Sequence, residues 1–206
     1  MKDCCENKAD ELAELRGRQA RVLGTVLAIN AVMFVVEAAG GVAARSTALL
    51  ADSLDMFGDA SVYALTLWVL HRGPVWRARA ALVKGAVMGL FGVGVLVEAA
   101  LKLGSGVSPE AHTMSAIGFL ALVANLGCAV LLYRHRTDDL NLRSTWLCSR
   151  NDIFANLGVI LAAVAVGIVG SGWPDVLVGA FIAALFLRSA GSVLREAIAE
   201  LRRVQA

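Results

Sequence analysis

The stretch "STALLADSLDMFGDAS", from Ser46 to Ser61, places three aspartates in a segment that otherwise suits lipid. Asp52, Asp55 and Asp59 lie between an apolar run at 47–50 and a second one at 62–70. The whole segment is long enough to cross a bilayer as a helix, which takes about 20 residues. A charged side chain at the bilayer centre costs on the order of 2.5–3.5 kcal/mol, so these carboxylates indicate a helix that faces a bundle interior.

The rest of the chain has the composition of a membrane protein. Of its 206 residues, 58% are hydrophobic, and the mean hydropathy is +0.68. A soluble domain of this length cannot bury so much apolar surface. The net charge of +2 gives no sign of a nucleic-acid partner, and none is expected. No cleaved signal peptide is expected, because the first 21 residues are polar and charged.

Six apolar segments are predicted to cross the membrane as helices, which gives an all-α, polytopic membrane protein. They form one transmembrane domain over residues 22–194, with a short tail before it (1–21) and another after it (195–206). The predicted spans are 22–44, 47–70, 82–102, 113–133, 145–169 and 174–194.

The basic residues predict the orientation of these spans. Arginines and lysines gather before the first span and after the second, fourth and sixth, whereas the opposite side offers only Arg45 and Lys102. Loops rich in Lys and Arg stay in the cytoplasm. Both termini are therefore expected to be cytoplasmic, which agrees with an even number of spans.

Two pairs of candidate metal ligands stand four residues apart in two different spans. Asp55 and Asp59 project from one face of the second span, and Cys148 and Asp152 repeat this spacing in the fifth, followed by Asn156. Adjacent carboxylates repel unless a cation or a proton lies between them. One thiolate and three carboxylates on two helices suit zinc, which accepts sulfur and oxygen ligands at about 2.0–2.3 Å.

Less specific interpretations of these residues stay open. The acids could be ion-paired, although Arg150 is the basic candidate inside the spans and cannot neutralise three aspartates. Cys148 could be a small core residue, although its register with Asp152 favours a ligand. Asp52 could lie near the outer end of its helix and pair with Arg45.

Further polar and small residues in the spans carry weaker expectations. Glu37 and Glu98 are either protonatable groups that face the interior or packed neutral acids. Asn125 is expected to bridge two helices by a hydrogen bond, and Cys128 to be a core residue. Glycines that are expected to allow close helix packing are Gly40, Gly41, Gly85, Gly89, Gly92 and Gly94.

These motifs resemble those of the cation diffusion facilitator family. Residues 46–61 are similar to the family's second helix, which carries an acid or histidine, three residues and then an aspartate. The stretch "DDLNLRSTWLCSRNDIFANLGVILAA" (138–163) resembles its cytoplasmic loop and fifth helix, and 173–197 resembles its sixth helix. The resemblance covers about residues 20–200 and implies a proton-coupled exporter of divalent metal, usually a homodimer.

The candidate site follows from the paired motifs. Primary metal ligands are expected at Asp55, Asp59, Cys148 and Asp152. Secondary candidates are Asp52, Asn156, Glu37, Cys4 and Cys5. The two N-terminal thiols could hand a soft metal to the pore in a reducing compartment, or could belong to a disordered tail.

Two departures from the family's pattern matter. Asp55 and Cys148 stand where the family's zinc transporters often have histidine or aspartate, so the preferred metal stays open. Residues 195–206 are also too few for the cytoplasmic ferredoxin-like domain that most members carry. A homodimer is therefore expected to form through the membrane helices.

The leading expectation is a secondary transporter in the bacterial inner membrane that exports zinc, cadmium or a related divalent cation by metal/proton antiport. It would be no enzyme and would hold no permanent cofactor; its partners would be metal, protons, lipid and a second copy. The alternative is a non-transporting membrane metal-binding or scaffold subunit. An intramembrane hydrolase is disfavoured, because no nucleophile motif or oxyanion arrangement is visible.

Overall fold

A computed structural model describes residues 4–69, 74–135 and 140–205, with side chains placed for 21–61, 64, 75–104 except Arg77, 106–134 and 152–203. The expected all-α fold is confirmed, since helices make up nearly all of the described chain. The helices are α1 (Cys4–Ala44), α2 (Thr47–Val69), α3 (Pro74–Ser105), α4 (Ala111–His135), α5 (Leu140–Val169) and α6 (Trp173–Gln205).

Among the described residues, five helices are long and apolar enough to cross a membrane, and the chain is a polytopic membrane protein. The five candidate spans are Arg21–Ala44, Ala78–Gly104, Ala111–Arg134, Asp152–Val169 and Trp173–Arg203. The sequence predicted six. The sixth predicted span lies on α2, which is fully described only up to residue 61 and carries the three aspartates.

The aspartate-bearing helix α2 lies at the centre of the bundle. It packs against α1, α3, α5 and α6. Large exposed hydrophobic side chains occur on α1, α3, α4, α5 and α6, but not among the described side chains of α2. Its neighbours therefore shield the charged helix from lipid, which is how a bundle accommodates charges at membrane depth.

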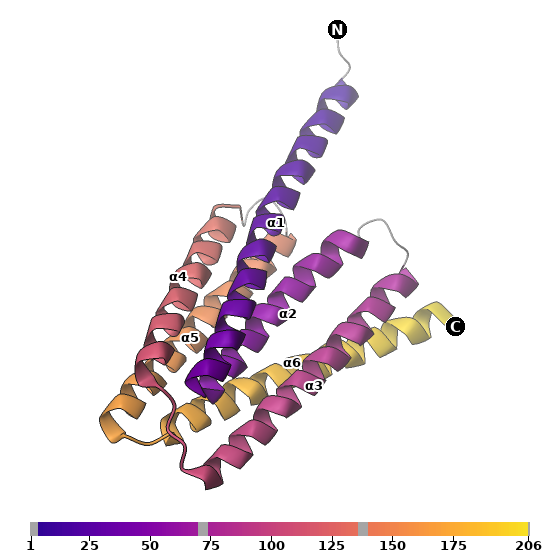
Figure 1. Cartoon of the computed structure of the whole chain (residues 1–206). Coiled ribbons are helices and arrows are strands. Elements are labelled where there is room, and N and C mark those ends of the chain that lie inside the picture. Colours follow the sequence, from indigo (N-terminus) through magenta and orange to yellow (C-terminus); the bar gives the residue numbers. More distant parts are fainter. Residues whose placement is uncertain (1–3, 70–73, 136–139, 206) are drawn as a thin grey trace.

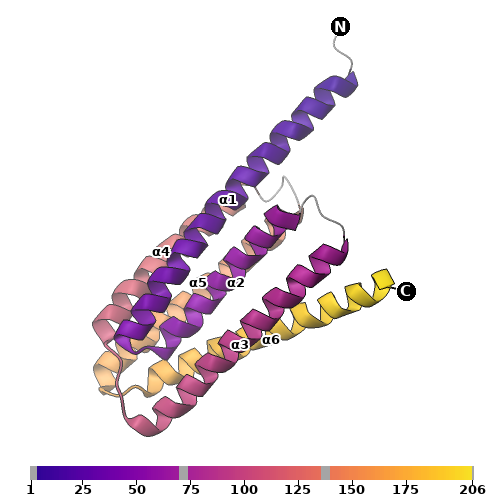
Figure 2. The same cartoon turned by 45° about the vertical axis from the view of Figure 1, so that its right-hand side comes forward.

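The other helices form two groups around α2. The helices α1, α2, α4 and α5 make a four-helix bundle, while α3 and α6 pack closely on each other and lie along one side of it (Figures 1 and 2). Successive helices run antiparallel, so the N-terminal end of α1 and the C-terminal end of α6 point toward the same end of the molecule. In both views α1 extends beyond the other helices at its N-terminal end.

Glycines allow the closest helix contacts. A Cβ added at Gly179 on α6 would lie 2.6–2.7 Å from backbone atoms of Thr47 and Ala48 on α2. Between α3 and α6, a Cβ at Gly85 would meet Leu194, and one at Gly92 would meet Leu187, both at 2.8 Å. The expected packing role is thus confirmed for Gly85 and Gly92.

The same expectation holds for two further glycines and fails for two. Added Cβ atoms at Gly40 and Gly41 would clash with Ile117 and Leu50 respectively. Gly89 and Gly94 have nothing within 4 Å of such an atom. The prediction of close packing was wrong at these two positions.

Candidate metal site

Three of the four expected ligands lie on facing helices. Asp55 and Asp59 are half-buried on α2, and Asp152 is half-buried on α5, which packs against α2. Asp152 lies within electrostatic reach of both Asp59 and Asp55, and Asp55 within reach of Asp59. Because α2 is the innermost helix, this repulsion acts in surroundings that screen it poorly.

The fourth expected ligand, Cys148, belongs to α5, but its side chain lies outside the described residues. The same holds for Cys4 and Cys5 in the first turn of α1. Among the side chains that the structure does describe, no group of three or more histidines, cysteines or acids is close enough to hold a metal ion. Like charges on facing helices repel, so bringing them to bonding distance requires a cation or a proton between them.

A chain of buried hydrogen bonds joins three helices beside these acids. The Asn156 amide on α5 donates to both carboxylate oxygens of Asp52 on α2, at 3.1 and 3.0 Å. Asn125 on α4 donates to the Asn156 side-chain oxygen at 3.3 Å, which confirms its expected bridging role. Asp52, Asn125 and Asn156 are all at most 1% exposed.

This arrangement corrects the expectation that Asp52 pairs with Arg45. The short turn between α1 and α2 holds Arg45 in the left-handed region (φ 52°), and its side chain is exposed. Asp52 lies more than one turn inside α2 and faces α5 instead. The buried carboxylate is therefore satisfied by an amide across the helix interface, as buried polar groups require.

Glu37 on α1 is the buried acid with no local partner. Its side chain is fully buried, and neither carboxylate oxygen has a hydrogen-bond partner. It lies within electrostatic reach of Asp52. Burying an ionised carboxylate without a partner is costly, so a neutral Glu37 is favoured in this conformation, which both expectations for this residue allow.

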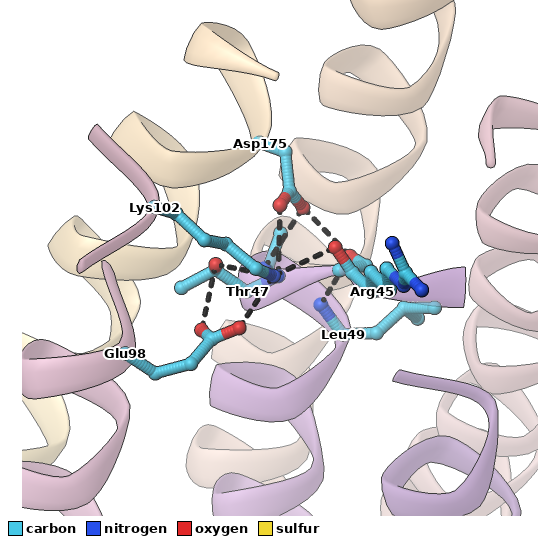
Figure 3. A network of polar contacts seen from close by, with 8 residues as sticks. Arg45, Thr47, Leu49, Glu98, Lys102 and Asp175 are labelled. Carbon is cyan, nitrogen blue, oxygen red and sulfur yellow. Dashed lines mark hydrogen bonds and ion pairs between the residues drawn. The ribbon is translucent and has the colours of Figure 1, made fainter. Parts of the chain in front are cut away.

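A second polar cluster, which the sequence analysis missed, surrounds the N-terminal end of α2 (Figure 3). Asp175 on α6 is fully buried and accepts three hydrogen bonds, from the Ser46 hydroxyl (2.6 Å) and from the backbone N–H groups of Thr47 (2.8 Å) and Ala48 (3.0 Å). Ser46 also accepts the Leu49 N–H at 3.1 Å, as an N-cap residue does. The carboxylate stabilises a helix end that would otherwise hold unpaired donors.

The same cluster corrects the expectation for Glu98 on α3. Glu98 forms an ion pair with Lys102 (2.5 Å) and accepts the Thr47 hydroxyl (2.8 Å). Lys102 also donates to the Arg45 carbonyl at 2.6 Å. Glu98 and Lys102 thus connect α3 to the N-terminal end of α2. A serine before an apolar run signals the cap in the sequence, and the four-residue spacing of Glu98 and Lys102 is typical of an ion pair on one helix. Nothing in the sequence signals that Asp175 and Glu98 lie at the end of α2.

Comparison with known proteins agrees with this geometry. Residues 24–202 match the family described as the cation efflux transmembrane domain. The chain is 29% identical over 202 residues to the metal cation efflux system protein CzcD of Cupriavidus metallidurans, covering 88% of this chain and 64% of that protein.

Other relatives show a similar degree of likeness. Identity is 29% over 191 residues to the cadmium, cobalt and zinc/H(+)-K(+) antiporter of Bacillus subtilis, covering 84% of this chain and 61% of that protein. Identity is 28% over 197 residues to the zinc transporter ZitB of Escherichia coli, covering 88% of this chain and 62% of that protein. The chain thus spans less than two thirds of the length of these relatives. The family match extends over most of the chain and includes both aspartate-bearing helices, so this membrane protein belongs to the cation efflux family.

Proposed function

We propose that this chain exports divalent metal cations, zinc or cadmium foremost, in exchange for protons. The observation that carries the proposal is the placement of Asp55 and Asp59 on α2 within electrostatic reach of Asp152 on the facing helix α5, in the interior of a membrane bundle. The family membership and the printed activities of the relatives support it. Membership in a family of efflux proteins also agrees with the expectation that the chain is no enzyme.

The proposed ligands of the transported ion are Asp55, Asp59, Cys148 and Asp152. A thiolate beside carboxylates suits the softer divalent ions. Asp52 and Asn156 bond to each other and so are better suited to positioning the two ligand helices than to holding the ion. Glu37, Cys4 and Cys5 remain secondary candidates.

Coupling to protons follows from the chemistry of these ligands. Carboxylates and thiolates bind metal only when deprotonated, so metal binding releases protons and metal affinity rises with pH. If the site is open in turn to each side of the membrane, metal leaves as protons enter from outside. The distribution of basic residues supports cytoplasmic termini, with 22–194 as the transport domain. We further propose a homodimer that forms through the membrane helices of a bacterial inner membrane.

The test is metal-driven proton movement in vesicles that contain the purified chain and a pH-sensitive dye. Zinc added to the wild type should move protons, and Asp59→Asn should slow this movement by about 100-fold or more, since one ligand is lost. Glu196→Gln is the matched control, because this exposed α6 carboxylate contacts only Ser192 on its own helix in the described structure.

Three results are distinguishable. Proton movement that is lost in Asp59→Asn and kept in Glu196→Gln supports the proposal. Zinc binding without any proton or zinc flux in the wild type would instead indicate a metal-binding or scaffold subunit. Exchange by Asp59→Asn at close to the wild-type rate would show that the carboxylates are structural.

A further inference from the structure

Glu37 lies on α1, outside the two helices that carry the proposed primary ligands. Its side chain is fully buried, and neither carboxylate oxygen has a hydrogen-bond partner in the described part of the chain. The sequence of α1 has no other charged residue between Arg21 and Arg45. A buried carboxyl group with neither a partner nor a counter-charge is most stable as the neutral acid. Glu37 is therefore suited to hold a proton in this conformation.

Acids on two other helices act on Glu37. It lies within electrostatic reach of Asp52 and Asp55 on α2 and of Asp152 on α5. Both oxygens of Asp52 already accept hydrogen bonds from the Asn156 amide. Because a negative charge nearby favours the neutral form of a carboxyl group, these acids help to hold a proton on Glu37. Whether the proton stays should therefore depend on the charge of the metal site.

The surroundings of Glu37 on the α4 side are apolar. α4 packs against α1 and places Ile117 against Gly40, one turn beyond Glu37. The titratable residue in the middle part of α4, Cys128, packs with Val26, about three turns of α1 away from Glu37. The charged groups that act on Glu37 in the described structure are all acids. Glu37 is thus enclosed by apolar side chains and like charges, without a base to neutralise it.

We propose that Glu37 binds one of the exchanged protons and releases it when a divalent cation enters the metal site. The inference rests on the proposed metal/proton exchange and adds a proton site that is not a metal ligand. A cation bound by Asp55 and Asp152 would offset the negative charge that holds the proton, and would stabilise the carboxylate left behind. The O–H bond of the acid breaks, the oxygen keeps the electron pair, and the proton passes to water on the side to which the site is open.

A further metal ligand is the competing role for Glu37. A ligand oxygen must come within about 2.0–2.2 Å of a zinc ion. The acid that acts most strongly on Glu37 is Asp52, ahead of Asp55 and Asp152. Asp52 is bonded across the helix interface to Asn156, so it serves the packing of the helices. This order of influence favours a proton site beside the ligands over a place among them.

The test counts the protons that zinc displaces from the purified full chain. Titration calorimetry in two buffers with different ionisation enthalpies gives the number of protons released per zinc bound. Glu37→Gln removes the proton site and preserves the shape of the side chain, so it should release about one proton fewer than the wild type. Glu196→Gln is the matched control at an exposed position on α6, and it should release the wild-type number.

The pH dependence of zinc affinity gives an independent measurement. Each displaced proton makes the affinity rise by up to about tenfold per pH unit, so the curve of the wild type should be steeper than that of Glu37→Gln by about this factor. At the acid end of the range the two proteins should bind zinc equally, because glutamine mimics the protonated acid. Loss of a metal ligand would instead weaken binding at every pH.

Glu37→Met is a second variant that removes the carboxyl group without introducing buried amide donors. Since neither oxygen of Glu37 has a partner in the described structure, an apolar side chain of similar size should be tolerated. Circular dichroism and the elution volume verify that each variant is folded. Glu37→Met should show the same deficit of about one proton per zinc.

Three results would overturn the inference. If the wild type releases protons and both folded variants release the same number, Glu37 keeps its proton and the proposed exchange still stands. A loss of zinc affinity at every pH in both variants would make Glu37 a ligand. Zinc binding without any proton release by the wild type would overturn this inference and the proposed exchange together.

Discussion

At the scale of single residues, the bond between Asp52 and Asn156 is the contact that best explains how two ligand helices hold their register. Asp52 precedes Asp55 by one turn of α2, and Asn156 follows Asp152 by one turn of α5. The two hydrogen bonds between them are fully buried, where breaking them would leave polar groups without a partner. Asp55 and Asp152 are thereby held on facing sides of the same interface.

A reciprocal exchange tests this role. Asn156→Asp alone should lower the free energy of unfolding by about 3–5 kcal/mol, because it puts a second buried carboxylate against Asp52. Asp52→Asn with Asn156→Asp restores one carboxylate and one amide, and an aspartate at 156 still accepts the bond from Asn125. The double variant should regain most of the stability and the zinc affinity, measured by thermal unfolding and calorimetry. Zinc affinity as poor as in the single variant would refute the positioning role.

The thiol of Cys148 should decide which metals the site prefers. Sulfur favours soft ions and oxygen favours hard ones. Cys148→Asp should therefore shift relative transport from cadmium toward manganese, and Cys148→His should favour zinc over cadmium. Glu196→Gln is the control, because this exposed α6 carboxylate bonds to Ser192 on its own helix. Unchanged transport ratios for zinc, cadmium and manganese in both Cys148 variants would mean that this thiol does not bind the ion.

At the scale of helices, α2 is anchored near its N-terminal end by its neighbours. Asp175 caps it from α6, Glu98 and Lys102 hold Thr47 from α3, and Gly179 allows α6 to touch its backbone. Farther along α2, Asp52 is hydrogen-bonded to Asn156 on α5. Toward the other end of the helix, an apolar pocket lies between α2 and α3. Among the described side chains of α2, the polar contacts to other helices therefore gather around its first turns.

Replacing Gly179 should separate α6 from α2. Because the added Cβ of Gly179→Ala would meet backbone atoms that cannot rotate away, we expect a loss of about 1–3 kcal/mol in unfolding free energy, as in overpacked cores. Gly89→Ala has open space and should be neutral or slightly stabilising, since alanine favours helices by up to about 1 kcal/mol. Thermal unfolding in detergent compares the two. Equal midpoints would contradict the close contact between α2 and α6.

At the scale of the whole molecule, metal binding should stabilise the bundle. The acids of α2 and α5 repel each other across the interface, and a bound divalent ion would remove that repulsion. We expect metal binding to stabilise all six helices together against unfolding, because α2 packs against four of the other five.

Zinc at about 100 times its dissociation constant should raise the free energy of unfolding by about 2.7 kcal/mol. The ligands bind metal only when deprotonated, so at a fixed zinc concentration the gain should shrink as the pH falls. Thermal unfolding at several pH values, with and without a chelator, measures it. Asp59→Asn should lose most of the gain, and Glu196→Gln should keep it. A gain that does not change with pH would contradict coupling to protons.

Much of the fold was predictable because the bilayer constrains the chain so strongly. In lipid each backbone group must be paired within its own segment, so apolar stretches of sufficient length become helices. The four-residue spacing of Asp55 and Asp59, and of Cys148 and Asp152, predicted which side chains share a face, because helix geometry is local.

Hydropathy and motif spacing were enough to predict an all-α membrane bundle, the family motifs and most of the acids in its interior, Asp175 excepted. The partners of these acids on other helices emerge only from the packed bundle: Asn156 rather than Arg45 for Asp52, Thr47 for Glu98, and the end of α2 for Asp175. Hydropathy indicates that a charged group must avoid lipid, but many neighbouring side chains could be its hydrogen-bond partner. Which one does so depends on the rotation and register of packed helices, and these are properties of the whole bundle.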